Sequence, residues 1–251
     1  MPAIEKQQGH DAEHHNLLHN WIKEFTGATD VTVEGSTQTK TDIITNNNIR
    51  FSHKFPTPRN TQVHLPTLAS FHAKFNLPKE VYDPLEMFLG TFDLEKLASW
   101  EEKLGITLNA NERRKRRVHS NHIPNFQNVL DYFTKITKDK SLLNYLLRQL
   151  RDEDPVDYLI WTSKKKGWSN LVDLDSYIDW LSEVSVWEAS KSGTTIFVKD
   201  PTWEGKRARR LLYMQMKGSG KSDYHAPMFH LYCNWPDKFI LESKTNFWLL
   251  R

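Results

Sequence analysis

The sequence predicts a mixed α+β protein, of the α/β type at its start, with a helical middle region and a C-terminal β segment. Three observations lead to this: apolar residues at helical spacing before Gly27, strict alternation over Ile49–Phe55, and strand-like apolar runs again after about residue 194. The 251 residues suffice for one large domain or for a core with a second module. We therefore expect three segments, 1–80, 81–190 and 191–251, the last packing on the first.

The first helix is expected from His10 to about Phe25, because its apolar residues recur on one helical face and Gly27 follows. Val31 and Val33 begin a short strand, and the polar run 35–41 reads as a loop. Two further strands, 42–45 and 49–55, flank the tight turn Asn46-Asn47-Asn48.

Pro56 and Pro58 end the third strand, and the rest of the chain then divides by periodicity. Helical spacing predicts helices over 65–77, 94–104, 125–136, 141–150 and 174–186. Alternating or continuous apolar runs predict strands over 194–198, 210–216 and 228–233. The region from about Asp83 to Glu188 is thus expected to be mostly helical.

Composition excludes several classes of protein. The 13 Phe, 9 Trp and 8 Tyr supply enough apolar surface for a packed core, which excludes a disordered chain. With Cys233 as the single cysteine, no internal disulfide forms, and an intracellular, cytoplasmic protein is expected. No apolar run reaches about 18 residues, so no membrane span is expected. The net charge of +3 does not by itself identify a partner.

The strand 49–55 and its neighbour carry the residues that point to chemistry. Alternation places Ser52 and Lys54 on one face, opposite the apolar face that includes Phe51 and His53. Asp42 begins the neighbouring strand, a short cross-strand distance from both polar side chains. Mg²⁺ prefers one or two carboxylates with water and phosphate, and a nearby lysine can position the attacking water. This arrangement predicts a metal site served by a lysine.

Glu13 adds a carboxylate from the first helix. It lies four residues before Leu17 and eight before Trp21, which predicts a position on the buried face of that helix. A buried carboxylate is costly unless it meets a cation or a metal ion. We therefore expect Glu13 beside Asp42 as a second metal ligand.

These residues resemble the motif of the PD-(D/E)XK nuclease superfamily, whose core is a helix, a strand, a hairpin with the catalytic residues and a further helix. Thr41-Asp42 corresponds to the P-D element, and Ser52-His53-Lys54 corresponds to D/E-x-K. The resemblance covers about residues 10–77 and implies a restriction-endonuclease-like core. It further implies that Asp42 holds Mg²⁺, or Mn²⁺ in its place, that Lys54 serves the water nucleophile, and that Glu13 is the helix-borne acid.

Two departures from that motif stand out. Thr41 replaces a proline that has no chemical role. Ser52 replaces an acidic metal ligand, which puts a two-metal mechanism in doubt and leaves Ser52 to bond a metal-bound water or a phosphate oxygen. The carbonyl of His53 is a candidate oxygen ligand in its place. The alternative is a purely structural role, in which Asp42 caps a turn and Lys54 is a solvated lysine at the strand edge.

Basic residues follow the core in three runs, of which the strongest is Arg113-Arg114-Lys115-Arg116-Arg117. The others are 164–166 and Lys206, Arg207, Arg209 and Arg210. Most charge runs are solvated surface, but three such runs polarise the surface in a way that suits a phosphate backbone. Further DNA contacts are expected at Gln38, Lys40, Lys217 and Lys221.

The tryptophans offer a second type of contact, because an exposed indole can stack on a nucleobase. Core packing is nevertheless the ordinary role of a tryptophan. The candidates are Trp161, Trp168, Trp180, Trp187, Trp203, Trp235 and Trp248. The segment 217–222 lacks the first glycine of a phosphate-binding loop, so no nucleotide cofactor is expected.

The sequence therefore predicts a Mg²⁺-dependent DNA endonuclease, site-specific and either restriction-like or phage-encoded, with double-stranded DNA as its partner. The alternatives are a non-catalytic DNA-binding protein with a nuclease-like fold and an interaction protein that does not bind nucleic acid. Cutting both strands implies a homodimer or sequential nicking, and the sequence does not decide between them.

Overall fold

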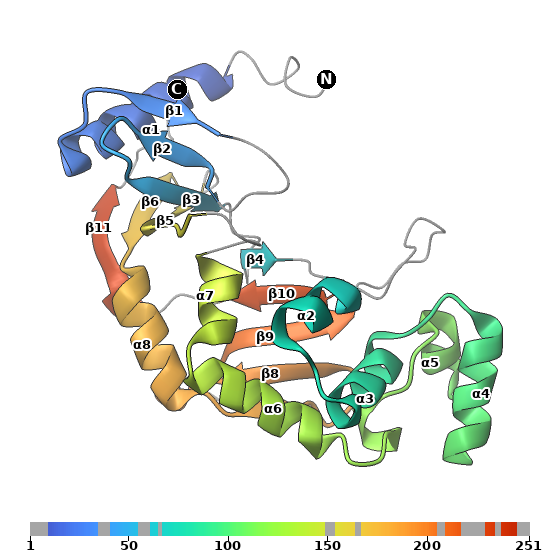
Figure 1. The fold of residues 1–251 in the computed structure, drawn as a ribbon. Coiled ribbons are helices and arrows are strands. Elements are labelled where there is room, and N and C mark those ends of the chain that lie inside the picture. Colours follow the sequence, from blue (N-terminus) through green and yellow to red (C-terminus); the bar gives the residue numbers. More distant parts are fainter. Residues whose placement is uncertain are drawn as a thin grey trace. The chain divides into compact units, whose positions relative to one another are not determined.

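The structure is a computed structural model that describes residues 10–34, 41–54, 61–64, 67–148, 154–163, 167–204, 209–216, 229–233 and 237–244. The predicted fold class, mixed α+β, is confirmed, because the described residues form helices together with two separate sheets (Figure 1). The chain divides into two compact units, each of them assembled from distant parts of the sequence.

Unit 1 comprises residues 1–56, 144–177 and 236–251. Its sheet has six strands in the order β1-β2-β3-β5-β6-β11. Their bounds are Val31–Val33, Ile43–Thr45, Arg50–Lys54, Tyr158–Ser163, Trp168–Val172 and Ile240–Lys244. The pairing of β3 with β5 is parallel and the other pairings are antiparallel. A parallel pair requires a crossover, and here the chain between Lys54 and Tyr158 supplies it.

Helix α1 (His10–Thr26) covers one face of this sheet (Figure 1). Leu18, Trp21 and Ile22 are at most 3% exposed and pack in one cluster with Ile43 and Phe51 of the sheet. Gly27 follows the helix with φ of +68°, a left-handed conformation that suits glycine, and its N–H bonds Lys23 O. The expected first helix, its glycine stop and its apolar face are thus present.

Unit 2 comprises residues 57–143 and 178–235. Its sheet is antiparallel, in the order β4-β10-β9-β8-β7. These strands are Thr61–His64, Phe229–Cys233, Arg210–Met216, Thr195–Lys199 and Trp187–Ala189. The helices lying wholly within unit 2 are α2 (Leu68–Phe75), α3 (Lys79–Leu89), α4 (Leu94–Leu104), α5 (Ala110–Lys115) and α6 (Gln127–Lys138).

Helix α6 supplies much of the core of unit 2. Val129, Phe133 and Ile136 lie on its buried side, at most 5% exposed, and the Phe133 ring meets the Trp187 ring edge-on with centroids 5.4 Å apart. The indole N–H of Trp187 donates to Thr137 Oγ1 at 2.9 Å, so this buried polar pair is satisfied. Helices α7 (Ser141–Leu147) and α8 (Leu174–Val184) contain the residues at which the chain passes from one unit to the other.

The compact units differ from the predicted segments 1–80, 81–190 and 191–251. Strands β5 and β6 lie inside the region expected to be helical, and β11 belongs to the sheet of unit 1 rather than to that of unit 2. Strand β5 reads Tyr-Leu-Ile-Trp-Thr-Ser, a short apolar run that periodicity cannot separate from a buried helix segment. Within the described residues, no helix is long and apolar enough to span a membrane.

Candidate active site

The β2–β3 hairpin positions the predicted catalytic residues. Its tight turn is closed by Thr45 N–H donating to Ile49 O at 3.0 Å, and Asn48 takes the left-handed φ of +65° that asparagine tolerates. The strands pair with Ile43 opposite Phe51, and the ladder continues through Asp42 N–H to Phe51 O at 2.9 Å. Asp42 therefore lies across from Ser52, as the alternation predicted.

One carboxylate oxygen of Asp42 collects three donors. Oδ2 accepts from Ser52 Oγ at 3.1 Å, from the His53 backbone N–H at 2.7 Å and from Lys54 Nζ at 2.9 Å. The other oxygen, Oδ1, accepts no hydrogen bond from the described residues. The site therefore combines an anchored carboxylate with one oxygen left to meet a ligand.

The burial of these groups differs. Ser52 is fully buried, the Lys54 side chain is 19% exposed, and the Asp42 side chain is 31% exposed. Lys54 Nζ also lies 3.4 Å from His53 O, so this ammonium bridges the carboxylate and a backbone carbonyl. An ion pair that is partly removed from water is stronger than a solvated one and holds its geometry better. Lys54 is thus paired and partly buried, unlike the solvated lysine at a strand edge that was the alternative interpretation.

His53 points to the opposite face of the sheet, as predicted. Its Nε2 lies 2.9 Å from Thr162 Oγ1, and that hydroxyl lies 2.5 Å from Ser169 Oγ. Thr162 and Ser169 are directly paired residues of β5 and β6. This row of polar contacts ties β3, β5 and β6 together, so the side chain of His53 stabilises the sheet while its backbone N–H serves Asp42.

Strand β5 brings Trp161 beside Lys54, a position that the sequence did not predict for this tryptophan. Trp161 is the parallel register partner of Lys54, and its ring meets that of Trp168 edge-on, with centroids 5.2 Å apart. The indole nitrogen of Trp161 is buried and has no hydrogen-bond partner within the described residues. No local sequence pattern predicts this contact, because Lys54 and Trp161 are 107 positions apart.

Glu13 lies within α1, but its side chain is outside the described residues, so its place beside Asp42 stays a prediction. The buried face of α1 passes through Leu18, Trp21 and Ile22. Leu17, one of the two residues used to project the position of Glu13, is only half-buried. The predicted contacts Gln38, Lys40, Lys217 and Lys221 also fall outside the described residues and stay predictions.

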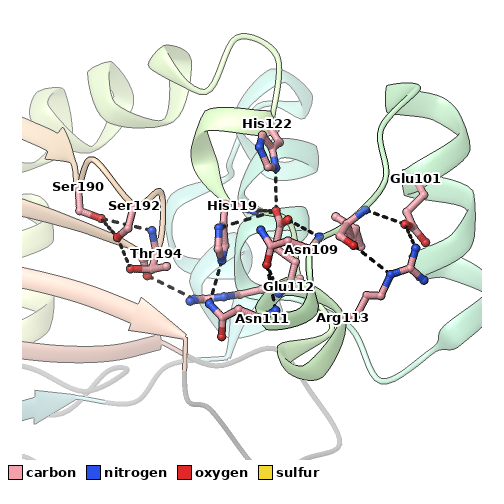
Figure 2. A network of polar contacts seen from close by, with 12 residues as sticks. Glu101, Asn109, Asn111, Glu112, Arg113, His119, His122, Ser190, Ser192 and Thr194 are labelled. Atoms are coloured by element: carbon pink, nitrogen blue, oxygen red, sulfur yellow. Dashed lines mark hydrogen bonds and ion pairs between the residues drawn. The ribbon is translucent and has the colours of Figure 1, made fainter.

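Four of the five side chains in the basic run 113–117 donate to other residues of unit 2. Arg113 forms an ion pair with Glu101 at 2.7 Å and donates through Nε to Leu108 O (Figure 2). Arg116 donates to Phe92 O, and Arg117 is 7% exposed and donates to Thr194 O at 3.3 Å. Arg117 is therefore occupied inside the protein, which corrects its assignment as a DNA contact. Arg114, an exposed residue, and Lys115 remain candidates for that role.

A buried carboxylate, Glu112, organises the backbone of the same segment (Figure 2). Its Oε1 accepts from the His119 backbone N–H at 2.7 Å and lies 2.9 Å from His122 Nδ1, and its Oε2 accepts from Asn109 N–H at 3.0 Å. Asn109 caps α5 in return, which completes a capping box. Burial alone would raise the pKa of Glu112, but these hydrogen bonds hold it below 4.5.

The segment around Glu112 also forms hydrogen bonds with the β7–β8 loop of unit 2. Ser120 N–H donates to Gly193 O at 3.0 Å, and Arg117 reaches Thr194 O. Gly193 has φ of +67°, and a Cβ at this position would collide with Asn121 Oδ1 and His119 Cβ. The Glu112 network is therefore a structural core of unit 2.

The donors available for a metal ion are few. Within the described part of the chain, no three His, Cys, Asp or Glu side chains lie close enough to hold one. Asp42 Oδ1, which accepts no hydrogen bond from the described residues, is one candidate ligand, and the carbonyl oxygen of His53, 3.4 Å from Lys54 Nζ, is another. These two oxygens suit a Mg²⁺ ion that keeps most of its ligands as water and phosphate, and among the described residues they are too few for a pair of ions.

Neither protein families nor curated proteins add to this picture: no family model matches the sequence, and no curated protein matches it. The site must accordingly be judged on its own geometry.

Proposed function

We propose that the chain is a Mg²⁺-dependent DNA endonuclease of the PD-(D/E)XK type. The observation that supports this most is the meeting of Asp42 and Lys54 at 2.9 Å on a hairpin whose second strand pairs in parallel with β5. A carboxylate, an ammonium and a hydroxyl thus converge from a D-x₉-S-x-K spacing. The partial exposure of Asp42 and Lys54 allows a phosphodiester to approach.

The residues present can bind and orient the reacting groups. Asp42 Oδ1 and His53 O are the oxygens that would hold Mg²⁺, which when bound polarises the scissile phosphate and lowers the pKa of a coordinated water. The contacts of Asp42 Oδ2 with Ser52 and the His53 N–H fix the carboxylate, so Oδ1 keeps one direction.

Lys54 has two roles available in this arrangement. Its ammonium lies between Asp42 and the His53 carbonyl, where it orients a water molecule and offsets the negative charge that develops on the phosphate. Fully buried Ser52 supplies a hydrogen bond and no charge, so it is a positioning residue for Asp42.

The test is cleavage of supercoiled plasmid with Mg²⁺ or Mn²⁺ by the wild type and by Lys54→Ala. We expect Lys54→Ala to abolish cleavage and to keep DNA binding, measured by gel shift in EDTA. Lys138→Ala is the matched control, since Lys138 is an exposed lysine near the end of α6, and it should cut like the wild type. Retained cutting by Lys54→Ala would refute the assignment.

A second candidate function is a non-catalytic DNA-binding protein that has the nuclease fold without the chemistry. The observation in its favour is Ser52, which stands where the superfamily motif has a metal-binding acid and leaves a single described carboxylate in the site. A purified protein that shifts DNA and leaves it intact with both metal ions would favour this function.

Double-stranded DNA is the proposed partner in both cases, and the end pattern of a digested long DNA separates the modes of action. Discrete ends indicate a site-specific endonuclease, and a smear indicates a nonspecific one. Sedimentation of the protein with and without a cleavable duplex distinguishes a homodimer from sequential nicking by a monomer.

A further inference from the structure

The β8–β9 turn of unit 2 carries an exposed tryptophan beside an arginine. Trp203 is 47% exposed, and the guanidinium carbon of Arg209 lies 5.5 Å from the centre of its ring. Arg209 itself is 32% exposed in its side chain. A large exposed aromatic ring in contact with a cation is an unusual surface feature that core packing does not explain.

A buried acid, Asp200, fixes the described ends of this turn. Asp200 is 2% exposed, and its Oδ1 accepts from the Thr202 N–H at 2.9 Å and from Thr202 Oγ1 at 2.7 Å. Its own N–H donates to Arg209 O at 2.8 Å, and its carbonyl accepts from Trp203 N–H at 3.4 Å. These bonds set the backbone on which Trp203 and Arg209 face each other, so the pair is held in place before any ligand arrives.

A second arginine repeats the arrangement on the adjoining strands. The guanidinium carbon of Arg210 lies 4.8 Å from the centre of the Phe197 ring and 5.7 Å from that of the Tyr213 ring. Phe197 and Tyr213 are direct cross-strand partners on β8 and β9. Two neighbouring arginines thus each contact aromatic rings at the same end of the β8–β9 pair.

Charge identifies the kind of ligand that this surface suits. The described residues of segment 199–210 include three basic ones, Lys199, Arg209 and Arg210, against Asp200 and Glu204, and the sequence has Lys206 and Arg207 in the part that the structure does not describe. Asp200 is buried, and its Oδ2 lies 3.9 Å from Arg209 Nε, so it offers little negative charge to a ligand. An exposed ring with one arginine against it, and a second arginine next in the chain, matches a nucleobase with its neighbouring phosphates.

We infer that Trp203, Arg209 and Arg210 form a binding site for an unpaired nucleotide of the DNA, with the base stacked on Trp203 and the flanking phosphates bound by the arginines. This inference rests on the proposed DNA function and adds a substrate feature to it, namely preference for DNA with an unstacked base. Within an intact duplex both faces of a base are covered by its neighbours, so the ring of Trp203 has nothing to stack on.

The experiment compares a labelled duplex with the same duplex carrying a short single-stranded gap, by fluorescence anisotropy in EDTA. The wild type should bind the gapped DNA about tenfold more tightly, the effect expected of one base stacked on an aromatic ring. Trp203→Ala should lose this preference, and Trp203→Phe should keep most of it. Val186→Ala, which truncates a 54% exposed apolar side chain elsewhere in unit 2, should behave like the wild type.

Salt dependence separates the two kinds of contact. Arg209→Gln should reduce the slope of log affinity against log salt by about one, because one phosphate contact is lost, whereas Trp203→Ala should leave that slope unchanged. A 2-aminopurine placed in the gap should be quenched by the wild type and much less by Trp203→Ala. A circular dichroism melt of each variant checks that the fold is intact.

The outcomes distinguish this inference from the proposed function. The inference is overturned if the wild type binds both DNAs equally, or if Trp203→Ala keeps the preference for gapped DNA. The proposed function still stands in that case if plasmid cleavage depends on Lys54. Gap preference without any cleavage supports the inference and favours the non-catalytic alternative. A wild type that binds neither DNA overturns both.

Discussion

Two carboxylates, Asp42 in unit 1 and Glu112 in unit 2, each accept several hydrogen bonds but differ in how many of their oxygens are occupied. Asp42 accepts three donors on one oxygen, leaves the other without a bond from the described residues, and is 31% exposed in its side chain. Glu112 has partners on both oxygens and is fully buried. The first arrangement is fixed yet incomplete, and the second is closed.

The difference separates a site from a structural element. A satisfied buried carboxylate stabilises the residues that donate to it and offers nothing to a ligand. A carboxylate anchored through one oxygen and accessible at the other can bind a cation without first reorganising. The most basic stretch of the sequence adjoins this closed network, and its last residue, Arg117, is 7% exposed and donates to Thr194 O.

The largest expected effect comes from Asp42→Asn, which should lower DNA cleavage at least about a hundredfold, because the amide removes the negative charge that would hold Mg²⁺. The free energy of unfolding should change by less than about 1 kcal/mol, since a partly exposed ion pair contributes little to stability. Initial rates of plasmid cleavage and urea unfolding measure the two quantities.

The comparison would break if Asp42→Asn unfolded the protein or cut at the wild-type rate. Either result would place Asp42 with Glu112, as a structural acid. Asp30→Asn is a suitable control, because Asp30 is an exposed aspartate of the same unit, just before β1.

Glu112→Ala should show the reverse pattern. Three hydrogen-bond donors would lose their buried acceptor, so we expect a loss of about 3 kcal/mol in the free energy of unfolding. The folded fraction should cut DNA at the wild-type rate, because Glu112 belongs to unit 2 and Asp42 to unit 1. Glu102→Ala, an exposed glutamate of α4, should change stability very little. Equal stability of the two variants would contradict the structural role.

The hairpin around Asp42 and the segment around Glu112 also show how much of the structure could be predicted from the sequence alone. Asp42, Ser52 and Lys54 lie on a local hairpin, so alternation and one turn sufficed to bring them together. Trp161 joins them through a parallel pairing across more than 100 residues, which no local pattern encodes. Arg117 was wrongly expected to contact DNA for a related reason: charge is visible in a sequence, but the distant carbonyl of Thr194 to which Arg117 donates is not. Strands β5, β6 and β11 illustrate the same limit for the fold.

The pH dependence of stability is the smallest effect and the most specific to the closed network. Burial lowers the pKa of His119 below its usual 6.5, the charges of Arg117 and His122 lower it further, and Glu112 opposes them. Below pH 6.5 the unfolded chain therefore binds more protons at this histidine than the folded chain does, and stability falls as the pH drops toward the folded pKa. Glu112 adds a second loss of stability below pH 4.5, since its pKa is lower in the folded chain than in the unfolded chain.

Urea unfolding between about pH 8 and pH 5 should accordingly show the wild type losing stability in acid and His119→Asn losing less of it. An identical slope in the two proteins would mean that His119 is protonated equally in the folded and unfolded chains, and the network around Glu112 would then be open to water.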